Sequence, residues 1–430
     1  MRYDVVVIGA GPAGLAAATT AARCGRTVAM LDAAPLPGGQ FWRHRAGDAG
    51  DGHRDWATFT ALRDQLSNVD YRPDSRVWFL EPGFTVHLEG GAQVSGARLV
   101  LATGAYDRAV PFPGWDLPGV VTAGAAQALL KGHGVAIGKR VVVAGTGPFL
   151  LPVAAGLASA GVRVPAVVEA ANPMGYLRGV PPLGKVAEAG AYLARLARHR
   201  IPYRTRRVVT AAHGTQRVTA VTVSGPGGQR VIECDALAVG YGFTPQVELA
   251  IAAGCDTVLG PDGALVVTVN GDQTTSVPGV YAAGEVTGVG GAELALLEGR
   301  LAGLAAAGRP LPAALLRRRC ALRRFAAVLA RVHPVPQWSR WCDESTVLCR
   351  CEGVTTGAVL RSVKESGVVD GRGAKLMTRA GMGWCQGRVC GLAASDLVAG
   401  ACRRPVSRDD LLAFGTRPIA QPVTLAELAE

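Results

Sequence analysis

Two stretches of this 430-residue chain show the same order of features, and that repetition constrains the fold more than anything else in the sequence. The first is DVVVIGAGPAGLAAATTAARCGRTVAMLD. The second, RVVVAGTGPFLLPVAAGLASAGVRVPAVVE, begins about 135 residues later. Each reads as an apolar strand, a glycine-rich turn, a helix of small residues and a second strand, which is one βαβ unit. Two such units predict an α/β protein with two Rossmann-like dinucleotide-binding domains.

The segments around these units predict that one domain is inserted in the other. Strand-rich stretches follow each unit, and TSVPGVYAAGEVTG then gives a strand and a turn ahead of a helix at about 292–307. The stretch HPVPQWSRW reads as a connector because prolines interrupt it. We therefore expect a first nucleotide-binding domain at 1–112 and 271–330, a second at 113–270, a linker at 331–347, a small helical domain at 348–405 and a tail at 406–430.

Charge and hydropathy exclude several classes of protein. The formal net charge of +12 comes mostly from arginines spread along the chain, with one run at Arg317–Arg319. Nucleic-acid binding needs a concentrated basic face or a reader motif, and the sequence has neither. The first residues resemble a signal peptide in part, but Asp4 and the glycines fit a strand, a turn and a helix better. Without a run of about 20 strongly apolar residues, we expect a cytoplasmic protein with no transmembrane segment.

The first glycine-rich turn has the features of a phosphate-binding site. Backbone amides at a helix N-terminus bind phosphate when glycines keep side chains away from the turn and the ligand. Asp32 ends the second strand at the spacing where an acidic residue accepts hydrogen bonds from ribose hydroxyls. The residues that we predict to bind a dinucleotide here are Gly9, Gly11, Pro12, Ala13, Gly14 and Asp32.

The second turn is less regular. Gly145 and Gly147 repeat the pattern, but Leu150 stands where a third glycine is expected. Glu169 occupies the acidic position and would repel a 2′-phosphate, so NAD or another adenine nucleotide, such as ATP, fits better than NADPH. A degenerate domain that is kept only for its shape is the alternative.

Four cysteines near the C-terminus form two closely spaced pairs. LCRCEGVT contains Cys349 and Cys351, and GWCQGRVC contains Cys385 and Cys390. The 33 residues between the pairs allow two short helices to return the second pair to the first. Four thiolates suit either tetrahedral zinc or an iron–sulfur cluster, so spacing leaves both open. Cys342 has no place in the pattern.

Further motifs resemble those of the two-dinucleotide-domain flavoproteins, the glutathione and thioredoxin reductase superfamily. These motifs are PGGQ, the ATG at 102–104 and YAAGEVTG at 281–288. The resemblance implies FAD at the first site and adds Gly39, Gln40, Thr103, Gly104, Gly284 and Glu285 to the cofactor-binding residues. The superfamily usually has Asp where this chain has Glu285. Its disulfide reductases carry a cysteine pair near the flavin, and GGQFWRH has none, so we expect no thiol–disulfide mechanism.

The cysteine-rich region also resembles a known module. CRCEGVTTGAVLRSV followed by TRAGMGWCQGRVCG is similar to the [2Fe-2S] domain related to bacterioferritin-associated ferredoxin. This resemblance implies a [2Fe-2S] cluster rather than zinc, with Cys349, Cys351, Cys385 and Cys390 as its ligands.

Nearly the whole chain resembles one family, the FAD-binding (alpha or A) subunits of heteromeric amino-acid and opine dehydrogenases. The most specific stretches are PFPGWDLPGVVTAGAAQALLKGHG and GYGFTPQVELA. The resemblance implies a subunit that relays electrons from a smaller flavoprotein (beta) subunit, which carries the amino-acid site, to a downstream acceptor. It further suggests FMN at the interface with that partner, a peripheral association with the membrane and a small ferredoxin-like subunit. We identify no catalytic residue for amine oxidation in this chain.

Two other functions stay open from the sequence. One is a self-sufficient NADH-dependent reductase, in which NADH at the second site reduces FAD and the cluster passes electrons to a ferredoxin-like or other small protein. The other is a structural or regulatory subunit whose cluster only stabilises the C-terminal region.

Overall fold

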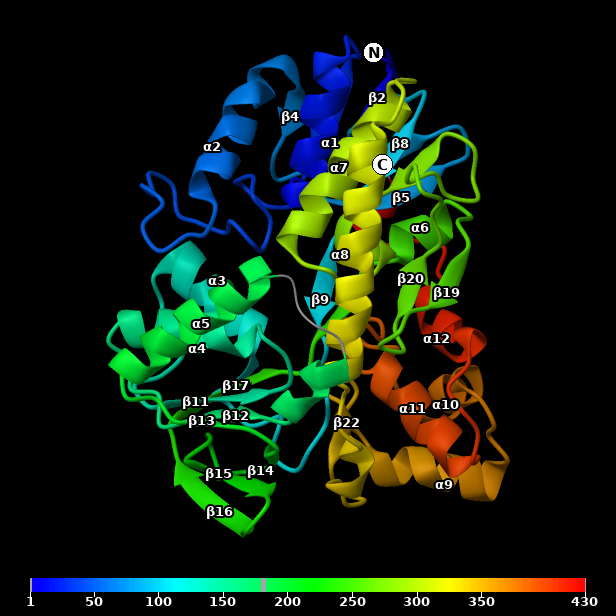
Figure 1. Ribbon diagram of the computed structural model, residues 1–430. Helices are drawn as coiled ribbons and strands as arrows, with labels where there is room; N and C mark the ends of the chain where they lie inside the picture. The colour runs from blue at the N-terminus through cyan, green and yellow to red at the C-terminus, as the bar shows by residue number, and fades with distance from the viewer. Residues whose placement is uncertain (1, 179–182, 430) are drawn as a thin grey trace. The chain divides into compact units, whose positions relative to one another are not determined.

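The computed structural model describes residues 2–178 and 183–429 and consists of two compact units (Figure 1). Unit 1 contains Met1–Tyr106, Thr244–Ala326 and Gly415–Glu430, and unit 2 contains Asp107–Phe243 and Ala327–Phe414. The fold class expected from the repeated βαβ pattern is confirmed. The domain boundaries drawn from the sequence stay a prediction, because units defined by contacts need not end where sequence domains end.

Unit 1 is built around a five-stranded parallel sheet. Every pair of neighbouring strands in it is parallel, and its central strands are completely buried. Helices α1 (Pro12–Arg23) and α7 (Ala292–Ala306) lie along each other beside the sheet (Figure 1). The strands, in spatial order, are β21 (Val280–Ala282), β8 (Leu99–Leu101), β2 (Val5–Ile8), β3 (Val28–Leu31) and β4 (Asp70–Arg72).

The rest of unit 1 surrounds this sheet. Its second sheet contains β1 (Arg2–Tyr3), β7 (Gln93–Gly96), β6 (Thr85–Leu88) and β5 (Val77–Glu81). The remaining strands form two pairs, β19 (Thr257–Leu259) with β20 (Leu265–Val267), and β9 (Ala105–Asp107) with β18 (Phe243–Pro245). Strands β9 and β18 each extend one residue beyond the segments of unit 1. The helices are α2 (Trp56–Asp64), η1 (Gln65–Asn68), α6 (Glu248–Ala252), η3 (Gly284–Thr287), α13 (Leu425–Ala429) and the first part of α8 (Ala313–Val332).

Unit 2 begins with a second five-stranded parallel sheet. In spatial order it contains β10 (Val120–Thr122), β17 (Ala236–Gly240), β11 (Val141–Gly145), β12 (Val167–Glu169) and β13 (Tyr203–Arg204). An antiparallel sheet of β14 (Val208–His213), β15 (Ala220–Gly225) and β16 (Gly228–Glu233) follows in the chain. The accompanying helices are α3 (Ala123–His133), α4 (Leu150–Ser159), η2 (Pro173–Arg178) and α5 (Leu183–Arg198).

The C-terminal part of unit 2 is a small, mostly helical module with well-capped helices. Thr355 accepts a hydrogen bond from the Ala358 amide at the start of α9, and Asp370 caps α10 through the Gly373 amide. Such caps satisfy backbone amides that have no hydrogen-bond partner within the helix. The elements are η4 (Trp338–Arg340), β22 (Val347–Cys349), β23 (Val354–Thr355), α9 (Thr356–Ser366), α10 (Gly371–Thr378), α11 (Gly391–Ala401) and α12 (Arg408–Gly415).

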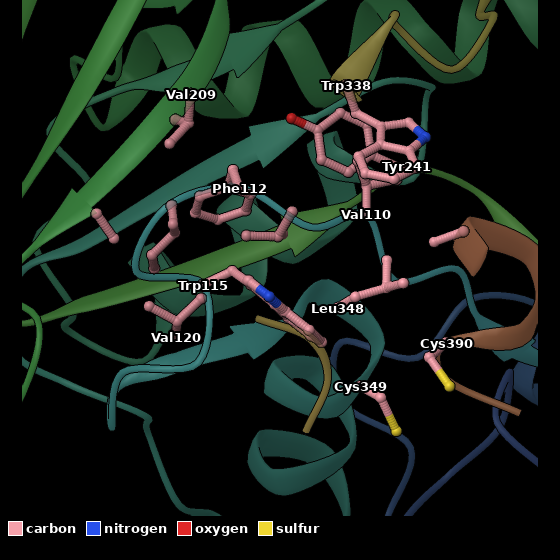
Figure 2. Close-up of a cluster of buried hydrophobic side chains, with 14 of the residues drawn as sticks. Val110, Phe112, Trp115, Val120, Val209, Tyr241, Trp338, Leu348, Cys349 and Cys390 are labelled. Atoms are coloured by element: carbon pink, nitrogen blue, oxygen red, sulfur yellow. The ribbon is translucent and has the colours of Figure 1, made fainter. Parts of the chain in front are cut away.

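One continuous apolar core joins this module to the second parallel sheet. Figure 2 shows Phe112 and Trp115 in this core and the thiols of Cys349 and Cys390 along one side of it. The indole Nε1 of Trp115 donates a hydrogen bond of 2.6 Å to the carbonyl oxygen of Val347, two residues before Cys349. The cysteine-rich module is therefore packed against the second nucleotide-type domain. Among the described residues, no helix has both the length and the apolar character needed to cross a membrane.

Candidate functional site

The first glycine-rich turn leaves its backbone open to a ligand. Gly9 has φ +104°, and a Cβ there would lie 2.3 Å from the Ala102 carbonyl oxygen. A Cβ on Gly14 would lie 1.7 Å from the carbonyl oxygen of Gly9, so neither position tolerates a side chain. Helix α1 begins at Pro12, directly after Gly11, and no side chain of the described residues caps its first turn. The free amides at this N-terminus fit a phosphate group.

The acidic residue after β3 lies beside this turn. The Asp32 carboxylate accepts hydrogen bonds from the backbone amides of Ala10 and Ala34, the second at 2.7 Å. Burial raises the pKa of Asp32, while these hydrogen bonds act in the opposite direction. The carboxylate is thus held at the end of the turn, where the sequence pattern expects a partner for ribose hydroxyls.

Two motifs that are distant in the sequence meet at the same turn. Gly39 has φ +59°, and a Cβ on it would lie 2.8 Å from the Cα of Gly11. A Cβ on Gly284 would lie 2.8 Å from the Cβ of Ala13. The structure therefore brings the PGGQ and YAAGE stretches into contact with the first glycine-rich turn.

The remaining predicted residues of this site take other partners. The hydroxyl of Thr103 donates to the Gln246 carbonyl oxygen at 2.7 Å, and the Gly104 carbonyl oxygen accepts from the Gln246 amide at 2.9 Å. Gln40 is exposed and accepts a hydrogen bond from Arg43. Glu285 points back to its own loop, where it accepts from the Gly291 amide at 2.8 Å. Burial raises the pKa of the Glu285 carboxyl.

A buried charge cluster that the sequence did not reveal holds the Gly284 loop. Glu298, in the middle of α7, is fully buried and accepts hydrogen bonds from the Gly284 amide and the Thr287 hydroxyl. Arg323 binds both of its carboxylate oxygens, at 2.8 and 2.7 Å, and Arg319 donates to one of them at 3.0 Å. The sequence features that could have indicated this cluster were Glu298 in the middle of an apolar helix and two arginines spaced four residues apart on α8.

The acidic residue of the second turn is enclosed by the protein. Glu169 accepts a hydrogen bond of 3.0 Å from the Gly147 amide, much as Asp32 accepts one from its own turn. Its side chain also accepts from the Tyr203 hydroxyl at 3.4 Å and lies 3.6 Å from Nδ1 of His333. His333 in turn contacts the Tyr176 hydroxyl at 2.7 Å. Glu169 therefore has side-chain partners, whereas the hydrogen bonds to Asp32 come from backbone amides.

The second turn also departs from the first where the third glycine is missing. Leu150 is fully buried, and its Cδ2 would lie 3.2 Å from a Cβ on Gly240, so a glycine at the end of β17 makes room for it. A Cβ on Gly145 would lie 1.8 Å from the Gly240 carbonyl oxygen, so the turn keeps its first glycine. The hydroxyls of Thr146 and Tyr241 are buried without a hydrogen-bond partner among the described residues.

The four predicted ligand cysteines converge in the C-terminal module. Hydrogen bonds connect Cys390 with Cys349, Cys390 with Cys385, and Cys385 with Cys351. The Cys390 thiol lowers the pKa of Cys349 to about 6 and that of Cys385 to about 5. Within residues 2–178 and 183–429, no group of three or more His, Cys, Asp or Glu side chains is arranged to hold a single metal ion. Cys342 stays apart, since its sulfur lies 3.6 Å from the Pro111 carbonyl oxygen.

Backbone amides surround these sulfur atoms. The amides of Gly381 and Glu352 donate to Cys349, those of Gly387 and Val389 donate to Cys385, and that of Cys385 donates to Cys351. Amide donors of this kind stabilise thiolates and influence the reduction potential of a cluster. The thiol set and its amides therefore fit an iron–sulfur cluster.

A residue beyond the expected end of the module supports the second ligand loop. The ring of Phe414, in α12, lies so close to Gly381, Gly387 and Gly391 that a Cβ on any of them would come within 2.7 to 2.9 Å of it. Phe414 is itself buried. The loop between the last two cysteines is thus packed on an aromatic ring from the part that the sequence suggested was a tail.

Two family models match the chain. Residues 3–307 match the pyridine nucleotide-disulphide oxidoreductase family, and residues 347–399 match the BFD-like [2Fe-2S] binding domain. The FAD-type fold and the [2Fe-2S] module expected from the sequence are confirmed by these matches. They also decide between the cluster and zinc in favour of the cluster.

Named relatives resemble the chain over almost its whole length. The A subunit of opine oxidase from Agrobacterium tumefaciens (strain Ach5) is 35% identical, over 99% of this chain and 91% of that protein. The HcnB subunit of hydrogen cyanide synthase from Pseudomonas aeruginosa (PAO1) is 33% identical, over 96% of this chain and 95% of that protein. The crystal structure of L-proline dehydrogenase from P. horikoshii has a TM-score of 0.75 at 22% identity, covering 100% of this chain and 80% of that one, which indicates a shared fold.

Proposed function

Because this chain belongs to the family that contains the A subunits of opine oxidase and the HcnB subunits of hydrogen cyanide synthase, we propose that it is the FAD- and [2Fe-2S]-containing electron-transfer subunit of a heteromeric amino-acid or opine oxidase. Its relatives are named as subunits, so the chain works with partner subunits. The amine is oxidised in the partner, and this chain relays the electrons to a downstream acceptor.

One observation carries this proposal: a dinucleotide turn and a four-thiol site occur in the same chain. FAD accepts electrons in pairs and a [2Fe-2S] cluster passes them singly, so together they convert one mode of transfer into the other. The turn from Gly9 to Gly14 would present its amides to the FAD phosphates, and Asp32 would accept hydrogen bonds from the ribose. The four cysteines, with the amides that donate to them, hold the cluster and exclude water from its inner side, because Cys349 and Cys390 are buried.

The second turn is proposed to bind an adenine nucleotide, NAD or ATP, which is not a hydride donor for the flavin. The unpaired buried hydroxyls of Thr146 and Tyr241 support a polar ligand there. The contacts of Tyr203 and His333 with Glu169 must open to admit ribose hydroxyls. In calorimetric titrations with ADP, the wild-type protein should therefore bind more weakly than a His333→Ala variant. Equal binding by the two proteins would contradict this arrangement.

The partner is proposed to be a smaller flavoprotein (beta) subunit that carries the amino-acid site. The family relation supports this, since the relatives are named as subunits of opine oxidase and of hydrogen cyanide synthase. FMN at the interface, a small ferredoxin-like subunit, the peripheral membrane association and the cytoplasmic location stay predictions.

Anaerobic spectroscopy tests the proposed function. The chain is co-expressed with a candidate smaller flavoprotein from the same genome, purified, and mixed with opines, proline, hydroxyproline or glycine in turn. We expect one of these substrates to bleach the flavin and cluster bands in the complex but not in the isolated chain. Bleaching of the isolated chain by stoichiometric NADH within seconds would favour the NADH-dependent reductase instead, a function that the family relation does not favour.

A further inference from the structure

The ligand loop of the C-terminal module has unusual surface chemistry. Of the seven tryptophans in the chain, only Trp384 is exposed, with 75% of its surface accessible. It lies directly before the ligand Cys385. Leu376 and Met377 on α10 and Met382 in the loop are exposed as well, with 62% accessibility at Leu376. Exposed large apolar side chains that gather in one place mark a site of interaction.

Two of these residues can be placed beside the thiols: Met377 lines the same depression as Glu352, which follows Cys351, and Trp384 directly precedes Cys385. Cys351 is exposed and Cys385 is half-buried, whereas Cys349 and Cys390 are buried. Gly383, between Met382 and Trp384, is so close to Cys351 that a Cβ on it would lie 2.3 Å from the Cys351 Cβ. The loop that carries Trp384 is therefore in contact with the exposed ligand cysteine, and a bound cluster would reach the surface at this cysteine.

The charge of the module favours an acidic partner. Residues 348–405 contain nine arginines and lysines but four acidic residues. Arg350 and Arg372 are exposed, and so is Arg379, which pairs with Glu352 at 3.0 Å. A depression of about 360 Å³ includes Met377 in its lining, with Arg361 beside the acidic Glu352 and Glu365. An apolar centre with a basic rim matches a protein partner whose surface is acidic around its own redox centre.

We propose that the surface formed by Leu376, Met377, Met382 and Trp384, the cluster face, is where a small acidic one-electron carrier protein docks. This inference rests on the proposed function, since it names the class of acceptor. One electron leaves this chain and reduces the carrier by one electron, with no bond formed or broken and no proton exchanged. The apolar residues bring the two centres close together, and the basic rim speeds association.

Binding of a defined probe tests the cluster face without turnover. The holoprotein is titrated by calorimetry with an oxidised, acidic plant-type [2Fe-2S] ferredoxin, and with basic cytochrome c for comparison. Two variants, Trp384→Ser and Leu376→Asp, are measured beside Val231→Ser, which changes an equally exposed apolar residue on β16 in another part of the unit. Visible spectra establish that the cluster is retained, and Leu376 is not next to any ligand in the sequence.

We expect the wild type and Val231→Ser to bind the ferredoxin with equal, salt-sensitive affinity. Trp384→Ser and Leu376→Asp should each weaken it at least about 10-fold, which is the loss expected for an interface anchor. Equal affinity in all four proteins overturns the proposal, as do a preference for cytochrome c, absence of binding to the wild type, or self-association through this surface. Failure of the proposed function would give a different result. No substrate would then bleach the flavin and cluster bands of the complex, while ferredoxin binding would persist.

Discussion

Replacing Arg323 by methionine should loosen the loop that contacts the first glycine-rich turn. Arg323 donates two hydrogen bonds to the fully buried carboxylate of Glu298 and one of 2.8 Å to the Gly288 carbonyl oxygen. Glu298 also accepts from the Gly284 amide, and Gly284 lies against Ala13. Loss of the guanidinium therefore acts on the flavin site through Glu298, which makes Arg323 a positioning residue.

The expected cost follows from the burial of the pair. Removing one partner of a buried ion pair costs about 3–5 kcal/mol, because the other charge stays without compensation. Arg319 still donates to Glu298, and 23% of the Arg323 side chain is accessible to solvent, so we reduce the expected loss to about 2–3 kcal/mol. This corresponds to a change of roughly 30- to 150-fold in the folding equilibrium.

Urea unfolding followed by flavin fluorescence measures the loss. Arg318→Met is the matched control, because Arg318 lies on the same helix but pairs with the exposed Glu293 on the surface, where such pairs contribute about 0–1 kcal/mol. A double variant with Glu298→Gln should lose less than the sum of the single variants, by about 1 kcal/mol or more. The reasoning is refuted if the free energies of unfolding of Arg323→Met and Arg318→Met lie within about 0.5 kcal/mol of each other.

Three further predictions concern the cysteine-rich module. Cys385→Ser should abolish the visible and EPR signals of the cluster and leave bound FAD unchanged; simultaneous loss of both cofactors would contradict their separate sites. Phe414→Ala should destabilise the module by about 3–5 kcal/mol and release the cluster at lower denaturant concentration, whereas Phe414→Leu should lose less, as absorbance during unfolding can show. Burial raises the pKa of Asp410, but hydrogen bonds from Arg404 and Ser407 hold it well below its ordinary value of 3.8. The contribution of the ionised Asp410 carboxylate to folding stability is thus complete above pH 3.8 and declines as the pH falls toward the folded-state pKa. Arg404→Gln should therefore lower folding stability at pH 7 much more than at pH 2.

The sequence predicted the elements whose geometry depends on short-range patterns. The two βαβ units, with the turn glycines and the acids Asp32 and Glu169, lie where periodicity and spacing suggested. The helix expected at about 292–307 is α7, Ala292–Ala306. These features can be predicted because a glycine-rich turn between a strand and a helix is compatible with few other local structures. The convergence of the two cysteine pairs was likewise implied by their spacing and by resemblance.

The contacts that the sequence did not reveal join residues far apart in the chain. Nothing local shows that Glu298 meets Arg323, that His333 reaches Glu169, or that Phe414 supports the second ligand loop. Leu150 stands where a third glycine was expected, and Gly240 on β17 makes room for it. Such compensations depend on tertiary packing, so no sequence window contains both partners.

The hydrogen bond from Trp115 to Val347 has a consequence for how this chain could have evolved. Here the module shares one core with the second nucleotide-type fold, and Arg350 stacks over the Trp115 ring at 5.0 Å. That fold consequently supports the cysteine-rich module through shared packing. A nucleotide-binding fold with such a structural duty can be retained by selection even in descendants that no longer bind a nucleotide.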